Sequence, residues 1–205
     1  MLKISNVSKT FNIGTINEKK ALRSINLHLE PEDFVTIIGG NGAGKSTMLN
    51  MVAGVYPIDS GVITLDGANI SRLPEHARAK YLGRVFQDPM RGTAADMEIQ
   101  ENLALALRRG QSRGLRWGIS GEEKEQYKKL LTRLDLGLEN RLSSKVGLLS
   151  GGQRQAIALL MSTMTPIDFL ILDEHTAALD PKTAELIMEL TGTVSYTHLT
   201  LPTKA

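Results

Sequence analysis

A glycine-rich segment in the first quarter of the chain limits most strongly what the chain can fold into. Residues 39–46 read GGNGAGKS and match the pattern G-x-x-x-x-G-K-[ST] at every fixed position. They follow an apolar, β-branched run at 34–38 and precede a helical pattern from Lys45 to about Ala53, which Gly54 ends. Glycines let several backbone N–H groups point inward at an anion, and the following helix adds its positive end. The sequence therefore predicts a strand buried on both faces, a phosphate-binding loop and a helix, in that order.

The rest of the chain divides into a strand-rich first third and a helical middle. Ile25, Leu27 and Leu29 alternate with polar residues, which predicts a strand with one face in water, and 61–67 predicts another short strand. From about 89 to 148 the pattern becomes helical, with a polar, glycine-containing loop at 110–121. These elements indicate an α/β chain.

Two carboxylates follow a short apolar run near the end of the chain. Phe169–Leu172 predicts a buried strand, and Asp173 and Glu174 come directly after it. Parallel sheets bind ligands at the carboxyl ends of their strands, so Asp173 is placed to hold Mg²⁺ through water. An ordinary strand end with a solvated acidic turn is the alternative, and it would be favoured if the phosphate-binding loop were absent.

A second glycine turn opens a helix at Ser150-Gly151-Gly152-Gln153. Taken alone, these residues predict a capping box, with Ser150 as the N-cap and Gln153 at the third helical position. A capped helix start with two glycines also presents N–H donors and a partial positive charge to an anion. The two interpretations are compatible.

These three motifs, in this order, resemble the ATP-binding-cassette (ABC) ATPase family over residues 1 to about 193. The resemblance implies an α/β fold: a P-loop NTPase (RecA-like) core with an N-terminal antiparallel β subdomain and an inserted helical subdomain at about 89–148. It implies an ATP-binding and ATP-hydrolysing subunit that powers solute transport across a membrane through a separate permease. It also implies a head-to-tail homodimer, with ATP between the phosphate-binding loop of one protomer and the signature loop, 150–153, of the other.

The resemblance also assigns roles to single residues. It implies that Glu174 polarises the attacking water, that Gln87 contacts Mg²⁺ or that water, and that Lys45 reaches the β- and γ-phosphates. Phe11 stands where the family stacks an aromatic ring on adenine, although an aromatic residue near a strand is more often part of a core. Most relatives carry proline where this chain has His175. The expected nucleotide contacts are Phe11, Gly39, Gly40, Asn41, Gly42, Ala43, Gly44, Lys45, Ser46, Thr47, Ser150, Gly151, Gly152 and Gln153, and the expected Mg²⁺ ligands are Ser46, Gln87 and Asp173.

Composition limits the possible partners and location. The chain has 24 Lys and Arg against 22 Asp and Glu, which argues against nucleic acid as the main partner. Cysteine is absent, which excludes disulfides and thiolate metal sites, and we find neither a signal peptide nor a spanning helix. With the resemblance, this predicts a cytoplasmic protein on the inner face of the cell membrane. The expected partners are a permease, contacted by Met90–Glu101, and a substrate-binding protein of the same system.

Other members of the family remain as alternatives. Soluble ABC ATPases of DNA repair or translation usually carry long coiled coils or two cassettes, and neither is visible here. Export ATPases share every motif described above. The amino-acid sequences of the loops at 39–46 and 172–181 are similar to those in the ATPases of uptake systems for small solutes such as aromatic amino acids. We therefore expect an amino-acid-type importer.

The last residues do not continue the pattern of the family. Residues 194–205 resemble the translation of a transposon-end adapter used in DNA library preparation. We therefore expect the native part of this sequence to stop near Thr193. The family also places a switch histidine at the end of a further strand, and His198 lies too close to Glu174 to fill that place. A truncated nucleotide binder that hydrolyses ATP poorly is therefore a further alternative for the chain as written. Reading the source DNA past the codon for Thr193 tests this.

Overall fold

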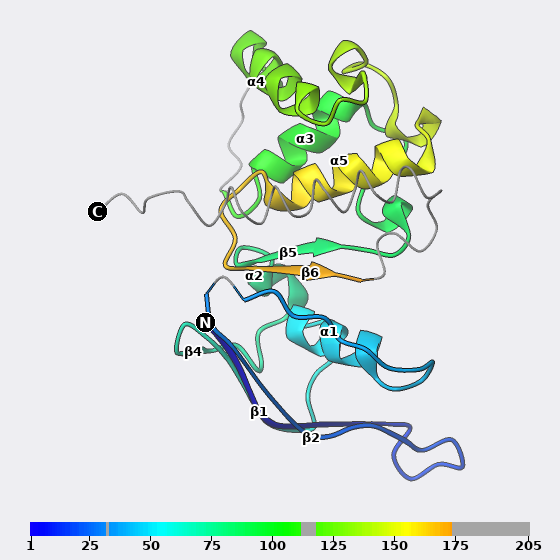
Figure 1. Ribbon diagram of the computed structural model, residues 1–205, viewed down its shortest axis with the longest axis vertical. Helices are drawn as coiled ribbons and strands as arrows, with labels where there is room; N and C mark the ends of the chain where they lie inside the picture. The colour runs from blue at the N-terminus through cyan, green and yellow to red at the C-terminus, as the bar shows by residue number, and fades with distance from the viewer. Residues whose placement is uncertain (32, 112–117, 174–205) are drawn as a thin grey trace. The chain divides into compact units, whose positions relative to one another are not determined.

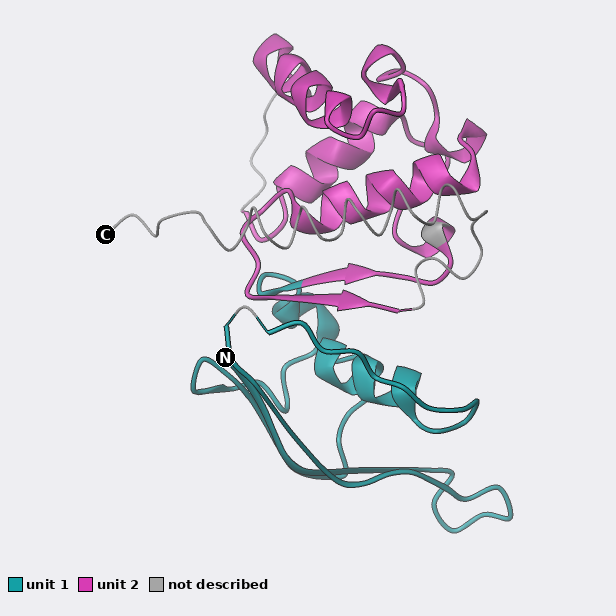
Figure 2. Ribbon diagram, in the orientation of Figure 1, with its two compact units in different colours: residues 1–82 teal, residues 83–205 magenta. Residues whose placement is uncertain are grey.

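The computed structural model describes residues 1–31, 33–111 and 118–173. The chain forms two compact units, Met1–Leu82 and Gly83–Ala205, which Figure 2 colours separately. We describe each unit by itself.

A four-stranded antiparallel sheet forms much of the first unit (Figure 1). It consists of β1 (Leu2–Phe11), β2 (Lys19–Leu29), β3 (Ser60–Leu65) and β4 (Ala68–Asn69), in the order β2-β1-β3-β4. Alternate residues of β1, among them Leu2 and Ile4, are buried because successive side chains of a strand point to opposite faces. The expected N-terminal antiparallel subdomain is therefore present.

Helix α1 (Lys45–Ala53) lies between β2 and β3 in sequence and packs on β2. It begins after Gly44 and ends at Gly54, both of which have left-handed backbone angles. A glycine in this conformation is the usual end of a helix, because the Gly54 N–H can turn back to the Met51 carbonyl, at 3.1 Å here. The prediction of this helix and of both its ends is confirmed.

A buried arginine fixes the last turn of α1. Arg78, at the end of α2 (Glu75–Arg78), has only 1% of its surface exposed. Its guanidinium donates to the carbonyls of Met51 and Val52 at 2.8 Å each, and also to those of Leu73 at 2.8 Å and Ser71 at 3.1 Å. A cation at the carboxyl end of a helix interacts favourably with its dipole, so Arg78 stabilises the end of α1 opposite the glycine loop.

The strand expected at 34–38 is not formed, and that prediction is wrong. Residues 33–40 form neither strand nor helix in the structure, and Phe34 and Ile38 are 71% and 90% exposed. A strand exists only where a neighbour accepts its backbone hydrogen bonds, and none pairs with this segment among the described residues. An apolar, β-branched run favours a strand without specifying its partner.

The described part of the second unit combines a small sheet with a helical group. Strands β5 (Leu82–Val85) and β6 (Phe169–Leu172) pair with each other, and their arrows point the same way in Figure 1. Helices α3 (Ile99–Leu107), α4 (Gly121–Thr132) and α5 (Gly151–Thr163) share one apolar core, with three short 3₁₀ turns at Pro89–Arg91, Leu138–Asn140 and Val146–Leu148. Its fully buried members include Ile99, Leu103, Tyr127, Leu131, Leu138 and Ile157. The prediction that the middle segment is mainly helical is confirmed.

Candidate nucleotide-binding site

The glycine loop of the first unit depends on two left-handed glycines. Gly42 and Gly44 have φ angles of +80° and +92°, a conformation that other residues adopt only with strain. A Cβ at Gly44 would lie 2.7 Å from the Ala21 carbonyl oxygen of β2, closer than such atoms can approach. The loop closes with a turn in which the Ala43 N–H donates to the Gly40 carbonyl at 3.2 Å. Glycine is therefore required at position 44 by both backbone angle and space.

Lys45 provides a cation at this loop. Its ammonium donates to the carbonyls of Gly39 at 2.6 Å and Gly40 at 3.3 Å, so it lies over the loop from which it emerges. No acidic residue occupies the first turn of α1, and Ser46, the second residue of the helix, is exposed. A glycine loop, a lysine and an uncompensated helix start form a donor set that fits a phosphate chain.

Lys19 is a second cation near the loop, and our sequence reasoning missed it. A Cβ built at Gly42 would lie 3.5 Å from the Lys19 ammonium. Lys19 begins β2 and is in register with Phe11 of β1. The adjacent lysines at 19 and 20 were visible in the sequence, but only the β1–β2 pairing brings one of them beside the loop.

Phe11 lies at the end of β1 and is only partly buried, unlike a core aromatic residue. Its ring meets the Tyr56 ring edge-on, with centroids 5.3 Å apart and planes at 82°. The Lys9 ammonium lies 5.6 Å from the Phe11 centroid. Tyr56 is another residue that sequence reasoning missed, because 45 positions separate it from Phe11.

In the second unit, the turn at 150–153 has the geometry of a capping box. The Gln153 N–H donates to the Ser150 hydroxyl at 3.3 Å, and the Ser150 N–H donates to the Gln153 side-chain oxygen at 3.2 Å. The capping interpretation is confirmed. Gly151 is exposed and Gly152 is buried, so the helix start is open to solvent at its first residue.

Two of the other predicted residues follow strands β5 and β6, which pair with each other. Asp173 follows β6, and its N–H donates to the Val85 carbonyl at 3.1 Å, while Gln87 follows β5 and is exposed. The Asp173 carboxylate lies 3.7 Å from the Arg84 guanidinium, and both side chains are largely buried. Arg84 was not predicted as a neighbour of this acid.

Several predicted residues lie elsewhere. Glu174, His175 and residues 194–205, including His198, are outside the described residues. The first unit contains Phe11, the glycine loop, Lys45, Ser46 and Thr47, whereas the second contains Gln87, 150–153 and Asp173.

In the described ranges, no helix has the length and apolar character needed to cross a bilayer.

Comparison with known sequences decides the family. The sequence family described as ABC transporter matches residues 22–177, more than half of the chain. This chain belongs to the ABC transporter family. The earlier resemblance is therefore confirmed, and the chain is an ATPase subunit of this class with the α/β P-loop fold.

Relatives within the ABC family come from systems of several kinds. The tyrosine transport ATP-binding protein of Clostridioides difficile (strain R20291) is 42% identical over 194 residues, which cover 95% of this chain and 77% of that protein. The methionine import ATP-binding protein MetN of Vibrio vulnificus (strain YJ016) is 32% identical, with 93% of this chain covering 53% of that protein. This chain thus spans about half the length of MetN. The lipoprotein-releasing system ATP-binding protein LolD of Hahella chejuensis (strain KCTC 2396) is 32% identical, with 93% and 79% covered.

Among solved structures, a dimeric post-hydrolysis state of the ABC cassette MJ0796 bound to ADP and Pi superposes with a TM-score of 0.79. It is 31% identical, and the match covers 96% of this chain and 84% of that one.

Proposed function

We propose that this ABC ATPase powers the import of a small solute of amino-acid type, and that the phosphate-binding loop is where its ATP phosphates bind. The observation that carries this proposal is the geometry of that loop. Two left-handed glycines, the Lys45 ammonium and an uncompensated helix start meet at one place in the first unit. The similarity to the tyrosine transport protein supports an amino-acid-type solute.

In this proposal the phosphate-binding loop holds and orients ATP. Lys45 exchanges its carbonyl contacts for the β- and γ-phosphates, and the loop N–H groups of Gly40–Lys45 donate to phosphate oxygens. Phe11 stacks on the adenine ring. Lys19, whose ammonium lies beside Gly42, adds a second positive charge near the loop, and it acts through charge alone because its side chain is exposed.

Ser46, Gln87 and Asp173 are the residues we propose as Mg²⁺ ligands, directly or through water. Hydroxyl, amide and carboxylate oxygens are the donors that Mg²⁺ prefers. When bound, the ion would neutralise charge on the phosphate oxygens. Arg84 holds the Asp173 carboxylate in place at 3.7 Å. Glu174, directly after Asp173, would accept the proton of the attacking water.

We further propose that the active unit is a head-to-tail dimer in which Ser150–Gln153 of one protomer face the ATP of the other. The capped start of α5, with its exposed Gly151, suits an anion. Similarity to a dimeric cassette supports this arrangement.

The permease contact that we propose, Met90–Glu101, is held in shape by a buried asparagine. The Asn102 side chain accepts from the Ala94 N–H at 2.7 Å and donates to the carbonyls of Ala94 and Glu98 at 3.0 Å each. Asp96 lies within the turn that these bonds fix, and it is exposed. A charge on a preshaped, exposed turn is well placed to meet a partner.

Reversing that charge tests the proposed transport role. We expect Asp96→Arg to lower the fraction of the chain that co-purifies with the permease encoded beside its gene by about fivefold or more. In this proposal Asp96 faces a positive group of the permease, and that group would repel the introduced arginine. ATP affinity of the isolated chain should not change. Lys129→Glu, an exposed charge reversal on α4, is the matched control. Equal co-purification of both variants would refute the Met90–Glu101 contact.

The direction of transport has its own test. A gene for a substrate-binding protein beside the permease gene would support import, and we propose such a protein as a further partner. A neighbouring gene set for lipoprotein release would instead support the export alternative. The similarity to LolD is the observation that keeps this alternative open. In either case the chain would work at the inner face of the cell membrane.

A further inference from the structure

We infer that Tyr56 and Asp59 fix the position of Phe11, and that they thereby control affinity for the nucleotide base without affecting affinity for the phosphates. We call residues 56–59 the brace. This inference rests on the proposed function, in which Phe11 stacks on adenine. It adds two positioning residues that do not themselves belong to the phosphate-binding loop.

The first contact of the brace is aromatic. The Tyr56 ring meets the Phe11 ring nearly perpendicularly, at 82° with 5.3 Å between centroids, which is the preferred arrangement of an aromatic pair. A partly exposed ring at the end of a strand would otherwise be free to change rotamer. The Tyr56 ring restricts Phe11 to one position before a base arrives, so less entropy is lost on binding.

The second contact is a carboxylate that joins the brace to β1. Asp59 accepts from the Lys9 ammonium at 2.7 Å and from the Thr10 N–H at 2.6 Å, and its own N–H donates to the Ser8 carbonyl at 3.0 Å. These three residues immediately precede Phe11. Burial disfavours the ionised form, but the bonds from Lys9 and Thr10 outweigh it and lower the pKa of Asp59. The carboxylate is therefore ionised at neutral pH, and it holds the strand end that carries Phe11.

The third connection runs to the phosphate-binding loop. Val55 and Tyr56 donate their N–H groups to the Asn50 carbonyl at 2.9 and 3.3 Å, so the brace continues directly from the last turn of α1. Arg78 stabilises the same turn. Helix α1 thus begins at the phosphate-binding loop and ends at Ala53, three residues before Tyr56, which contacts Phe11. This short connection fixes the spacing between the phosphate contacts and the base contact.

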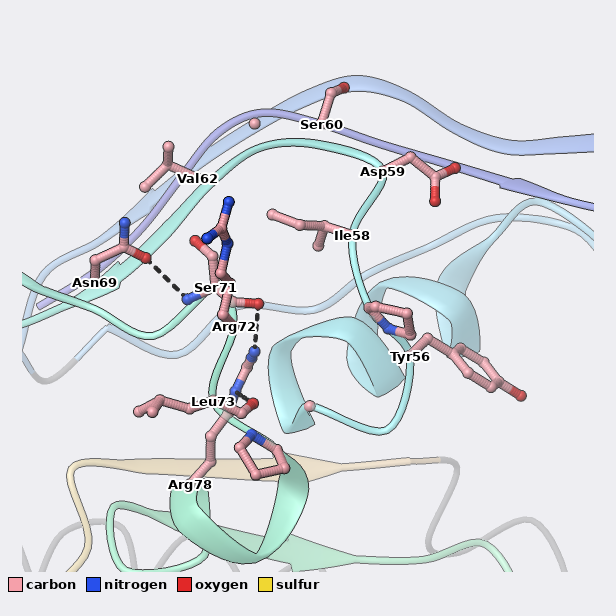
Figure 3. Close-up of a pocket in the computed structure, with 14 residues that line it drawn as sticks. Tyr56, Ile58, Asp59, Ser60, Val62, Asn69, Ser71, Arg72, Leu73 and Arg78 are labelled. Atoms are coloured by element: carbon pink, nitrogen blue, oxygen red, sulfur yellow. Dashed lines mark hydrogen bonds between the residues drawn. The ribbon is translucent and has the colours of Figure 1, made fainter.

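The cavity beside the brace supports this assignment. Residues 56–59 all line a cavity of about 840 Å³, and in Figure 3 the side chains of Tyr56 and Asp59 point in a different direction from that of Ile58. The Asn69 side-chain oxygen accepts from the Ser71 N–H at 2.9 Å, and the Arg78 donors are occupied by carbonyls. These polar groups of the cavity are thus occupied by the protein itself, whereas Tyr56 and Asp59 are directed at β1.

Inorganic tripolyphosphate separates a base effect from a phosphate effect, because it has no base. We expect Tyr56→Leu and Asp59→Ala to weaken ATP binding by the full chain about three- to tenfold, the size of an aromatic pair interaction. Tripolyphosphate affinity should stay unchanged in both variants. Tyr56→Phe should keep the ATP affinity of the unchanged chain, because it retains the aromatic ring that contacts Phe11. Titration calorimetry with each ligand gives the Kd values.

Three comparison variants make the outcomes distinguishable. Phe11→Ala should weaken ATP binding only, Lys19→Ala should weaken binding of both ligands, and Tyr81→Leu should affect neither. If Phe11→Ala leaves ATP affinity unchanged, the proposed stacking is wrong. If Phe11→Ala acts as expected but Tyr56→Leu does not, or if Tyr56→Leu weakens both ligands equally, the brace is refuted while the proposed function stands.

Discussion

Replacing Lys45 by alanine is expected to lower the affinity of the chain for ATP by roughly 10- to 150-fold. A hydrogen bond to a charged group typically contributes about 1.5–3 kcal/mol, which corresponds to this range of affinity. The Lys45 ammonium already lies over the loop, 2.6 Å from the Gly39 carbonyl, so it needs little rearrangement to reach a phosphate. Because it is a phosphate contact, tripolyphosphate affinity should fall by the same factor. Calorimetric titration of both ligands measures the effect.

The control for this change is Lys3→Ala. Lys3 is an exposed lysine of β1, so the variant removes the same charge from the same unit. Its ATP affinity should equal that of the unchanged chain. Thermal unfolding without ligand should show that Lys45→Ala still folds, because the lysine is only partly buried. A Lys45→Ala chain that is folded and binds ATP as tightly as the control would contradict the assignment of the loop.

Replacing Glu174 by glutamine is expected to lower turnover sharply while preserving ATP binding. An amide cannot accept a proton from water, and loss of a general base typically costs 10²- to 10⁴-fold in rate. The proposed dimer should then persist in ATP, because its ligand is not consumed. Steady-state phosphate release and light scattering after gel filtration measure the two effects. Both variants and the unchanged chain are compared in the gene product whose sequence is read from the source DNA.

Glu122→Gln on α4 serves as the control for that experiment. Glu122 is an exposed carboxylate at the start of a surface helix, and its loss should leave turnover unchanged. Unchanged phosphate release by Glu174→Gln would remove Glu174 from the role of base. Lost turnover with lost ATP binding would instead mean that Glu174 is needed for the fold of the site.

Local chemistry explains which features the sequence predicted correctly. Helix α1, its glycine end at Gly54 and the capping box of Ser150 and Gln153 are all determined by residues within four positions of one another. Left-handed glycines and N-cap hydroxyls act on their own backbone, so their pattern is visible without tertiary structure. The glycine loop belongs to the same class.

Features that depend on distant partners could not be predicted. The run at 34–38 has strand propensity, but pairing depends on a neighbour that the pattern does not name. Asp59 meets Lys9 across 50 positions, and Arg78 reaches the Met51 carbonyl across 27. Periodicity would have placed Arg78 at the surface, as is usual for arginine. Four carbonyl acceptors allow it to be buried instead.

The central claim is that residues 39–47 bind the phosphates of ATP, and amide NMR tests it most directly. The 205-residue, 22.4 kDa chain is small enough for a ¹H–¹⁵N spectrum titrated with Mg²⁺ and ATP. We predict the largest shift changes at the amides of Gly40–Thr47, with smaller changes at Phe11 and Tyr56 that tripolyphosphate does not reproduce. Saturable shifts confined to other residues, or no shifts at millimolar ATP, would contradict the account.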